Sequence, residues 1–257
     1  MAWEEAVITF YRLNRFGYYF YGVNAPEFGG LGNSLDQLRD WVAPGAKPIA
    51  NTCTYELDEG EENYRTFCYD IVKHRVTGDH LLTTWNETPS VDGEIASVDG
   101  NGVVGNAQVD MTEIPDGHIP GFATYFWFIP EHNVFATIRF RHRNVGVDSM
   151  ILYLREFLAK FTDHVVSRED GHGGIEILAY SHAGEDYTNI YPRVSANIFK
   201  KAGQVDGIMA NHQRISKLIR KNTLDPEVHE HTSMWSGLVR ALVPDGERWP
   251  QKTGPLA

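Results

Sequence analysis

The chain has 257 residues, 42% of them hydrophobic and 12% aromatic, with a formal net charge of -11. This composition supplies a packed core and excludes wholesale disorder, and no apolar run approaches the length of about 18 residues that predicts a membrane-spanning helix. The length fits one large domain or two small ones, and the acidic total argues against strong non-specific binding of nucleic acid.

The N-terminus and the cysteines bear on the cellular location. Residues 1–5 lack the basic start and the apolar run of a secretory signal. Cys53 and Cys68 are the only cysteines, and both lie on segments expected to be strands, so they could pair across a sheet. Because a chain with two cysteines and no secretory signal is typical of the cytosol, we expect two reduced thiols in a soluble cytoplasmic protein.

The N-terminal half alternates strand patterns with turns. β-Branched and aromatic side chains form two early runs, and a capping residue then precedes a short helical segment that stops before Pro44 and Gly45. Short β segments separated by turns fill residues 49–109. The expected elements are strands at 7–13, 16–21, 64–72 and 80–85, and a helix that Asn33 or Ser34 caps and that ends at Val42.

The second half begins with the clearest local prediction, a hairpin in which residues 122–129 and 134–141 flank the turn 130–133. Apolar residues at three- and four-residue steps then predict two amphipathic helices. These two helices are expected at 147–165, capped by Asp148, and at 205–223. The remaining expected elements are a short helix at 233–242, a strand at 175–180 and a further segment at 191–202.

A polar, glycine-rich break at 167–174 is the expected domain boundary. It would separate a β-rich α+β domain, residues 1–166, from a smaller α+β subdomain with a basic helix, residues 167–257, unless both form one continuous domain. Strands followed by helices predict the α+β class, with an antiparallel β-rich N-terminal half packed with amphipathic helices in the C-terminal half.

Charge is divided unevenly along the chain. Residues 1–134 hold 7 Lys and Arg against 20 Asp and Glu, a net -13, whereas residues 135–257 hold 16 against 14, a net +2. Local clusters of basic groups decide phosphate binding more than the net charge does. The asymmetry therefore directs the search for a nucleic-acid interface to the C-terminal half.

Two rows of basic side chains follow regular spacings. Arg139, Arg141 and Arg143 alternate on one expected strand and so share one face. A second row lies on the expected helix at 205–223, away from its apolar stripe. Such rows neutralise phosphates, although an amphipathic helix exposes charged residues in any case. The candidate nucleic-acid-binding residues are Arg139, Arg141, Arg143, Lys200, Lys201, Arg214, Lys217, Arg220 and Lys221.

The aromatic run 18–21 is a second candidate for contacts with nucleic acid. Exposed aromatic side chains stack bases in proteins that bind single strands. Four consecutive aromatic residues place rings on both faces of a strand, however, so at least half of them are expected in the core.

Motifs of catalytic or cofactor sites are missing or have another explanation. Gly100 to Gly105 match the glycine spacing of a dinucleotide-binding loop, but residues 103–109 look like a strand where such a loop needs a helix, so we expect a turn. His229 and His231 could chelate a metal together with His212, but no regular ligand spacing supports this. We expect no cofactor, metal or catalytic residue, while the question of an enzymatic activity stays open.

The hairpin and the helix after it resemble a known family. Residues 121–129, a short turn, residues 134–140 and a helix bearing Tyr153 to Leu158 are similar to the middle of the phage lambda exclusion protein RexA and related phage-defence proteins. The likeness continues downstream to the basic helix, and so covers roughly half of the chain. It implies a cytoplasmic, dimeric DNA-binding protein of antiviral defence, without an enzymatic site of its own.

The hypothesis from the sequence is therefore DNA binding by the C-terminal half, in phage exclusion or antiviral defence. One alternative is an interaction module or inhibitor whose acidic residues mimic nucleic acid or dock a basic partner. Another is a nuclease-like enzyme with an unfamiliar site. The first alternative rests on Glu56, Asp58, Glu59, Glu61 and Glu62, and the second on Asp110, Asp116, His172, Glu176, His182, Asp186, His229 and His231.

Overall fold

The computed structural model describes residues 6–57, 65–88, 96–110, 114–140, 146–169 and 174–199. The chain divides into two compact units, Met1–Lys201 and Ala202–Ala257, and all the elements below belong to the first. The helices expected at 205–223 and 233–242 lie outside the described residues. No helix of the described part is both long and apolar enough to cross a membrane.

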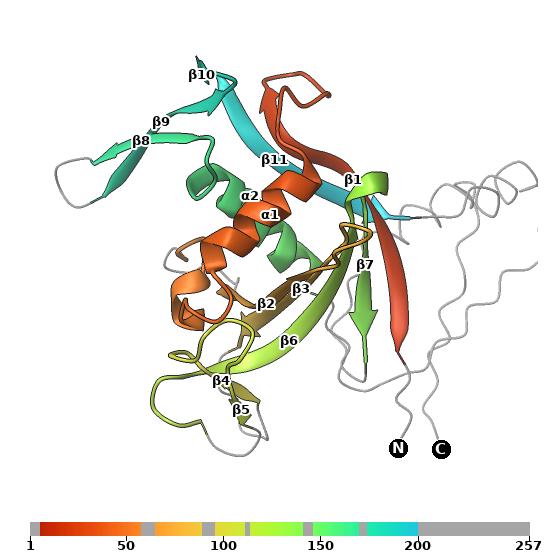
Figure 1. The fold of residues 1–257 in the computed structure, drawn as a ribbon, viewed down its shortest axis with the longest axis vertical. Helices are drawn as coiled ribbons and strands as arrows, with labels where there is room; N and C mark the ends of the chain where they lie inside the picture. Colours follow the sequence, from red (N-terminus) through yellow and green to blue (C-terminus); the bar gives the residue numbers. More distant parts are fainter. Residues whose placement is uncertain are drawn as a thin grey trace, which may run out of the picture. The chain divides into compact units, whose positions relative to one another are not determined.

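A strongly curled antiparallel sheet forms the framework of this unit (Figure 1). Its main path runs β11–β1–β7–β6–β3–β2, and two short strands, β4 and β5, extend it beside β6. The strands are β1 (Val7–Phe20), β2 (Thr66–Lys73), β3 (His80–Glu87), β4 (Ser97–Asp99), β5 (Val109–Asp110), β6 (His118–Ile129), β7 (Val134–Arg139) and β11 (Ile190–Ile198).

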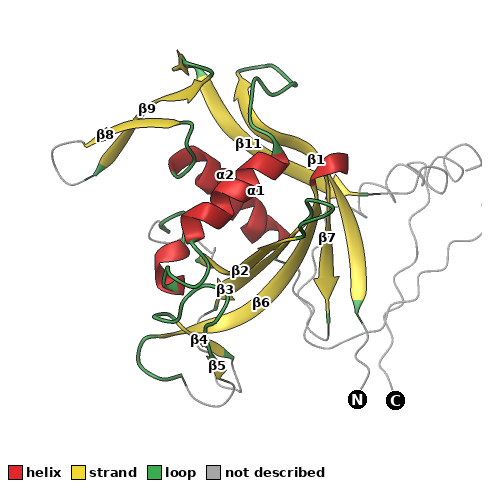
Figure 2. Cartoon of the chain, viewed as in Figure 1, coloured by secondary structure: helices red, strands yellow, loops and turns green. Residues whose placement is uncertain are grey.

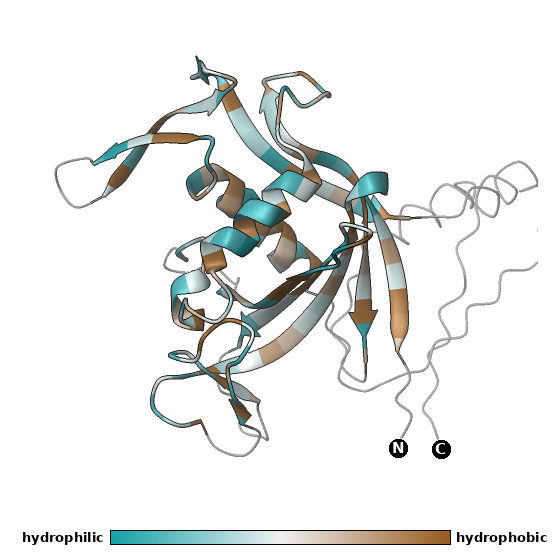
Figure 3. Cartoon of the chain, viewed as in Figure 1, coloured by the Kyte–Doolittle hydropathy of each residue, from teal (hydrophilic) through white to brown (hydrophobic). Residues whose placement is uncertain are grey.

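Two α-helices, α1 (Leu31–Val42) and α2 (Val147–Lys160), lie within the curve of the sheet (Figure 2). Trp41 of α1 joins them, because its ring centroid lies 5.6 Å from that of Phe157 on α2 and 4.6 Å from that of Phe161. Leu35 and Leu38 bury the inner side of α1, and Figure 3 shows the hydrophilic side of this helix turned away from the sheet. Single-turn 3-10 helices occupy Ile49–Thr52 and Pro130–His132.

Alternation along the strands separates an inner face of the sheet from an outer face. Phe126, Phe128 and Phe135 point inward and are completely buried beneath the helices. Trp127, between two of these residues, points outward and lies near Phe10, which is 41% exposed. The inner face is therefore the core, and the outer face is where side chains stay accessible to a ligand.

A second sheet, in the order β10–β9–β8, follows α2. Its strands are β8 (Val165–Glu169), β9 (Ile175–His182) and β10 (Glu185–Tyr187). The break expected at 167–174 thus begins inside β8, which pairs with β9 in a hairpin. The domain boundary expected at 166/167 stays a prediction.

The expected α+β class is wrong. Strands make up 48% of the structure, and the described residues contain only two α-helices, one of them in the N-terminal half. Every element from Val165 to Ile198 is a strand, and β11 returns to pair with β1. The physical reason is the period-two pattern of β11, which buries Ile190 and Val194 on the inner face only once a partner strand holds it there.

Local predictions fare better than the class. The predicted hairpin at 122–141 is confirmed as β6 and β7, and the predicted helix at 147–165 is confirmed but ends at Lys160. Gly100 to Gly105 lie in turns and open no helix, as expected. The predicted caps are wrong, because Gly30 and Gly146 occupy the N-cap positions of α1 and α2. The separate strands expected at 7–13 and 16–21 form one strand, β1.

Candidate nucleic-acid interface

The outer face of the β1–β11 ladder brings three arginines together. Leu13 and Val194 are buried on the inner face, so their neighbours Arg12 and Arg193 point outward. Arg15 points outward as well, because it pairs with Ser195, the other neighbour of Val194. These arginines come from opposite ends of the described chain, and only the pairing of β1 with β11 makes them neighbours.

A β-bulge places Arg12 and Arg15 on the same face. In a regular strand, residues three positions apart point to opposite sides of the sheet. The register of β1 against β11 shifts between Leu13 and Arg15, so that Asn14 is an extra residue in the ladder. A bulge of this kind re-aims the side chains that follow it. Sequence periodicity alone assigns Arg12 and Arg15 to different faces, which is why it misses this cluster.

The three guanidinium groups contact neutral partners. Arg12 lies over the ring of Phe199, with its Cζ atom 5.0 Å from the ring centroid. Arg15 donates a hydrogen bond of 2.6 Å to Asn24 Oδ1, and Arg193 donates one of 2.8 Å to the hydroxyl of Tyr191. Within the described part of the chain none of the three arginines forms an ion pair.

Aromatic rings accompany these arginines. Tyr21 is 87% exposed, its ring centroid lies 6.5 Å from that of Tyr191, and Phe199 is 44% exposed. We call this set the arginine–aromatic strip, and it consists of Arg12, Arg15, Tyr21, Tyr191, Arg193 and Phe199. The aromatic run 18–21 is divided much as expected, since Tyr18 and Tyr19 are buried and Tyr21 is exposed.

Gly17 allows the loop that contains Phe28 to approach β1 closely. It pairs with Arg193, and its φ of +123° is a backbone conformation that side chains with a Cβ rarely adopt. A Cβ at this position would lie 2.6 Å from the carbonyl oxygens of Phe28 and Gly29. The loop that contains Phe28 can therefore hydrogen-bond to β1 only because residue 17 is glycine.

An apolar surface continues the strip across the outer face. Phe10 lies beside Phe199, because the Phe199 amide donates a hydrogen bond to the Phe10 carbonyl oxygen. The centroid of the Phe10 ring lies 6.5 Å from that of Trp127. In the next strands of the same row, Leu81 is 41% exposed and Val72 is 52% exposed. The outer face thus combines cationic and apolar groups along one continuous row of strands.

Of the predicted basic residues only Arg139 lies within the described part of the chain, so the two basic rows stay predictions. Arg139 ends β7, and its neighbour Ile138 faces outward beside Tyr125 and Ile8. Arg139 consequently faces inward, where its charge acts on the hydroxyl of Tyr11. The other predicted residues lie outside the described residues: Arg141, Arg143, Lys200, Lys201, Arg214, Lys217, Arg220 and Lys221.

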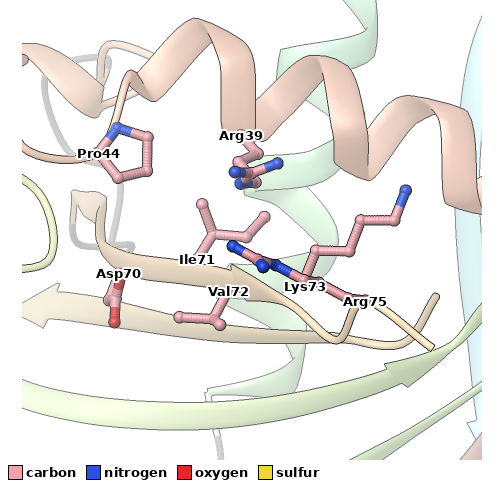
Figure 4. Close-up of a pocket in the computed structure, with 7 residues that line it drawn as sticks. All are labelled: Arg39, Pro44, Asp70, Ile71, Val72, Lys73 and Arg75. Atoms are coloured by element: carbon pink, nitrogen blue, oxygen red, sulfur yellow. The ribbon is translucent and has the colours of Figure 1, made fainter. Parts of the chain in front are cut away.

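A cationic cleft of about 370 Å³ lies between α1 and β2 (Figure 4). Figure 4 shows Arg39 reaching from α1 towards β2, which carries Lys73, with Arg75 just beyond its end. Asp70 and Val72 point to the opposite side of the strand from Ile71. Cleft residues that bear no positive charge are Pro44, Asp70, Ile71 and Val72.

Asp36 of α1 forms hydrogen bonds to residues of β2 and β3 beside this cleft. Lys73 Nζ donates to both Asp36 carboxylate oxygens at 2.7 Å, and His80 Nε2 donates to Oδ1 at 3.1 Å. Burial opposes the ionisation of Asp36, but the hydrogen bonds from Lys73 and His80 outweigh it and lower the pKa of the carboxyl. Because Asp36 stands on α1, the network fixes this helix against β2 and β3.

Where the structure describes them, the carboxylates and histidines proposed for an enzyme have structural contacts or lie on the surface. Glu176 pairs with Arg168 at 2.7 Å, and the ring of His182 stacks on that of Phe28 at 4.7 Å. Among the described residues, no group of three or more His, Cys, Asp and Glu side chains is placed to hold a metal ion. Outside the described residues lie Asp58, Glu59, Glu61, Glu62, His172, His212, His229 and His231.

Comparison of the chain with protein-family models, with curated proteins and with solved structures finds no match. The resemblance to phage-exclusion proteins therefore stays a prediction from the sequence.

Proposed function

We propose that this protein binds DNA through the arginine–aromatic strip on the outer face of β1 and β11. The observation that carries the proposal is the set of three outward arginines, Arg12, Arg15 and Arg193, which have no acidic partner in the described structure and stand among exposed rings. Guanidinium groups of this kind bind phosphates in a fixed, forked geometry.

The strip fits a single strand better than a duplex. Tyr21 and Phe199 lie near its two ends, and stacking on exposed rings needs bases that are not paired. Arg12 and Tyr21 are nine residues apart, along β1 and one residue past its end, which corresponds to at most about 30 Å. This length accommodates a short run of nucleotides, within the range of about 4 to 16 that single-strand sites occupy.

The net charge of -11 limits the proposal to a local, salt-sensitive interaction. Phosphate binding depends on the arginines that touch the backbone, and each contact releases counterions, so affinity should fall steeply with salt. The remainder of the acidic surface repels DNA and should suppress non-specific binding elsewhere on the molecule.

The wider setting of the proposal comes from the sequence. The resemblance to phage-exclusion proteins supports a cytoplasmic homodimer that acts in antiviral defence, with DNA binding and no catalysis as its contribution. The arginine–aromatic strip is the first surface to test, because its side chains lie within the described residues.

The test is a titration of the full chain with a fluorescent single strand of about 20 nucleotides and with the matching duplex, at about 50 and 200 mM salt. The triple variant Arg12→Gln, Arg15→Gln, Arg193→Gln should weaken single-strand binding at least about tenfold and reduce the slope of log affinity against log salt by up to about 2. The matched control, Arg65→Gln, Arg155→Gln, Arg168→Gln, removes equal charge from arginines that are paired with glutamates. Unchanged binding by the first variant would refute the proposal that the strip binds DNA.

A second variant separates the two candidate surfaces. Replacing Arg214, Lys217 and Lys221 with Glu alters the predicted basic helix and leaves the strip intact. If this variant alone abolishes binding, the protein binds DNA through the C-terminal row and the strip is not the interface. If wild-type protein binds neither DNA at low salt, DNA binding itself is wrong.

A further inference from the structure

Among the described strands, β2 forms an edge of the sheet, and this edge is a second candidate binding surface, remote from the strip in the strand order. β2 is the last strand of the path β11–β1–β7–β6–β3–β2, whereas the strip lies on the first two. We propose that an extended acidic peptide adds to this edge as a further antiparallel or parallel strand, in the cleft between α1 and β2. The proposal does not depend on DNA binding.

The backbone of β2 has hydrogen-bonding groups available for such a strand. His74 donates its N–H to Asp79 across the hairpin at 2.7 Å, which fixes the alternation along the strand. The backbone N–H and C=O groups of Val72 therefore point towards β3, while those of Ile71 and Lys73 point away from it. In the described part of the chain, the carbonyl of Ile71 and both backbone groups of Lys73 have no partner, and the Ile71 N–H lies against the Asp70 carboxylate.

The open stretch is short because neighbouring segments already cover the start of β2. Gly105 donates its N–H to the carbonyl of Tyr69 at 2.8 Å, and the Cys68 N–H donates to Thr52 Oγ1 at 2.9 Å. Unpaired edge groups attract other strands, and proteins commonly cover them. Here the cover stops where the cleft begins, so the exposed edge and the cleft coincide.

The charge of the cleft selects the chemistry of the peptide. Arg39 and Arg75 line it and form no ion pair within the described residues, while Lys73 shares its charge with Asp36. Ile71 forms an apolar floor between these cations (Figure 4). Asp70, the acidic residue of the lining, points to the opposite side of β2 from Ile71 (Figure 4). Because alternate side chains of an added strand point to the same side, a peptide with acidic and apolar residues in alternation would match both features.

The contacts of Asp36 fix the position of α1 relative to β2, so the cleft is formed before a peptide binds. The two hydrogen bonds of Asp36 with Lys73 and its contact with His80 keep α1 at a fixed distance from the edge of β2. A groove between a helix and an edge strand that is already formed needs little rearrangement when a peptide binds.

The first experiment uses the full chain and a fluorescein-labelled peptide of about eight residues in which glutamate and valine alternate, with the same peptide carrying lysine for glutamate as its counterpart. Anisotropy should show binding of the glutamate peptide at least about tenfold tighter than the lysine peptide. The variant Arg39→Gln, Arg75→Gln should lose this preference, and the control Arg155→Gln, Arg168→Gln should retain it. Equal binding of the two peptides would overturn the proposal.

The second experiment tests strand addition itself. Lys73→Ala removes the ammonium but keeps the outward N–H, whereas Lys73→Pro removes that N–H as well without breaking the ladder to β3. We expect Lys73→Pro to bind the glutamate peptide about tenfold more weakly than Lys73→Ala. Equal affinities would contradict strand addition.

Hydrogen exchange on the unmodified chain provides a readout that does not require either variant to fold. The glutamate peptide should slow exchange of the Lys73 amide. A Lys73 amide that exchanges at an unchanged rate under saturating peptide overturns the proposal. Protection by a single-stranded oligonucleotide in place of the peptide would also overturn it, and would assign the cleft to nucleic acid.

Discussion

Tyr18 links the sheet to α2 through one hydroxyl group. It donates to the carbonyl of Leu158 at 2.6 Å, and its oxygen lies 2.6 Å from Thr162 Oγ1. The ring is completely buried, and burial raises the pKa of the hydroxyl far above its ordinary value of 10. The group is therefore a neutral donor throughout the physiological range, and its role is to bond to the carbonyl of Leu158 in the last turn of α2.

Replacing this hydroxyl should destabilise the fold. Tyr18→Phe keeps the ring but removes the shorter of the two hydrogen bonds to the Leu158 carbonyl, which keeps only the bond of 3.3 Å from Thr162 Oγ1. We therefore expect the free energy of unfolding to fall by about 1 kcal/mol. Urea unfolding followed by circular dichroism measures the loss. Tyr21→Phe is the matched control, since Tyr21 is 87% exposed and should change stability very little. Equal losses in the two variants would contradict the assigned role.

His80 is buried in its neutral form. Asp36 can only accept a hydrogen bond, so His80 Nε2 carries the proton, and its buried Nδ1 has no partner. A protonated ring would place an unsatisfied N–H there. Burial lowers the pKa of His80 below its ordinary value of 6.5, although Asp36 acts in the opposite direction.

Stability should consequently depend on pH through His80. Below pH 6.5 the unfolded chain binds a proton that the folded chain resists, so stability present above pH 6.5 is lost as the pH falls towards the folded pKa. One proton corresponds to a slope of at most about 1.4 kcal/mol per pH unit. The free energy of unfolding should fall by more between pH 7.5 and pH 5 in the wild type than in His80→Gln, whose dependence on pH should be flatter. Parallel slopes would exclude His80 as the cause.

At the scale of elements, the ladder between β3 and β6 depends on one close approach. Gly121 pairs with Glu87, and a Cβ at position 121 would clash with the carbonyl oxygen of Asn86 and lie 2.9 Å from Trp85 Nε1. The indole of Trp85 donates to Ile119 on the same strand as Gly121, at 3.0 Å. At position 121, β3 and β6 therefore lie too close together to admit any side chain.

Gly121→Ala should lower the free energy of unfolding by about 1 to 3 kcal/mol, because backbone atoms must move to admit the methyl group. Thermal unfolding measures this effect. Gly30→Ala is the comparison, since nothing lies within 4 Å of a Cβ there and its cost should be much smaller. A tolerated Gly121→Ala would contradict the close packing of β3 and β6.

At the scale of the whole molecule, charge counted along the chain does not describe the surfaces. Arg12 and Arg15 belong to the acidic part of the sequence, residues 1–134, whereas Arg193 belongs to the mildly basic part. The fold pairs β1 with β11 and so gathers arginines from both parts. The division of charge by halves therefore points away from the surface that the structure offers.

The two free thiols should report separately on local and global opening. Burial raises the pKa of both thiols, but Cys68 is completely buried on the inner face of β2 whereas Cys53 is partly accessible. A thiol reagent should therefore label Cys53 in the native state and Cys68 only at the rate of global unfolding. Labelling of Cys53→Ser and Cys68→Ser variants, compared with unfolding kinetics, distinguishes the sites. Fast labelling of Cys68 in the native state would contradict its place in the core.

The sequence by itself determined the elements whose periodicity is local. Strands β3, β6 and β7, the helix α2 and the partition of the aromatic run follow from side chains within a few positions of one another. These patterns hold because each element must bury one face whatever its partner is.

Only the tertiary structure decided the class of the fold and the candidate sites. The bulge at Asn14, the return of β11 to β1 and the free edge of β2 depend on pairings between distant segments. Such pairings are selected by mutual burial and by hydrogen bonds across the whole sheet, so the pattern of a single segment does not identify its partner. For this reason the arginine–aromatic strip and the cleft beside β2 could not be read from the sequence.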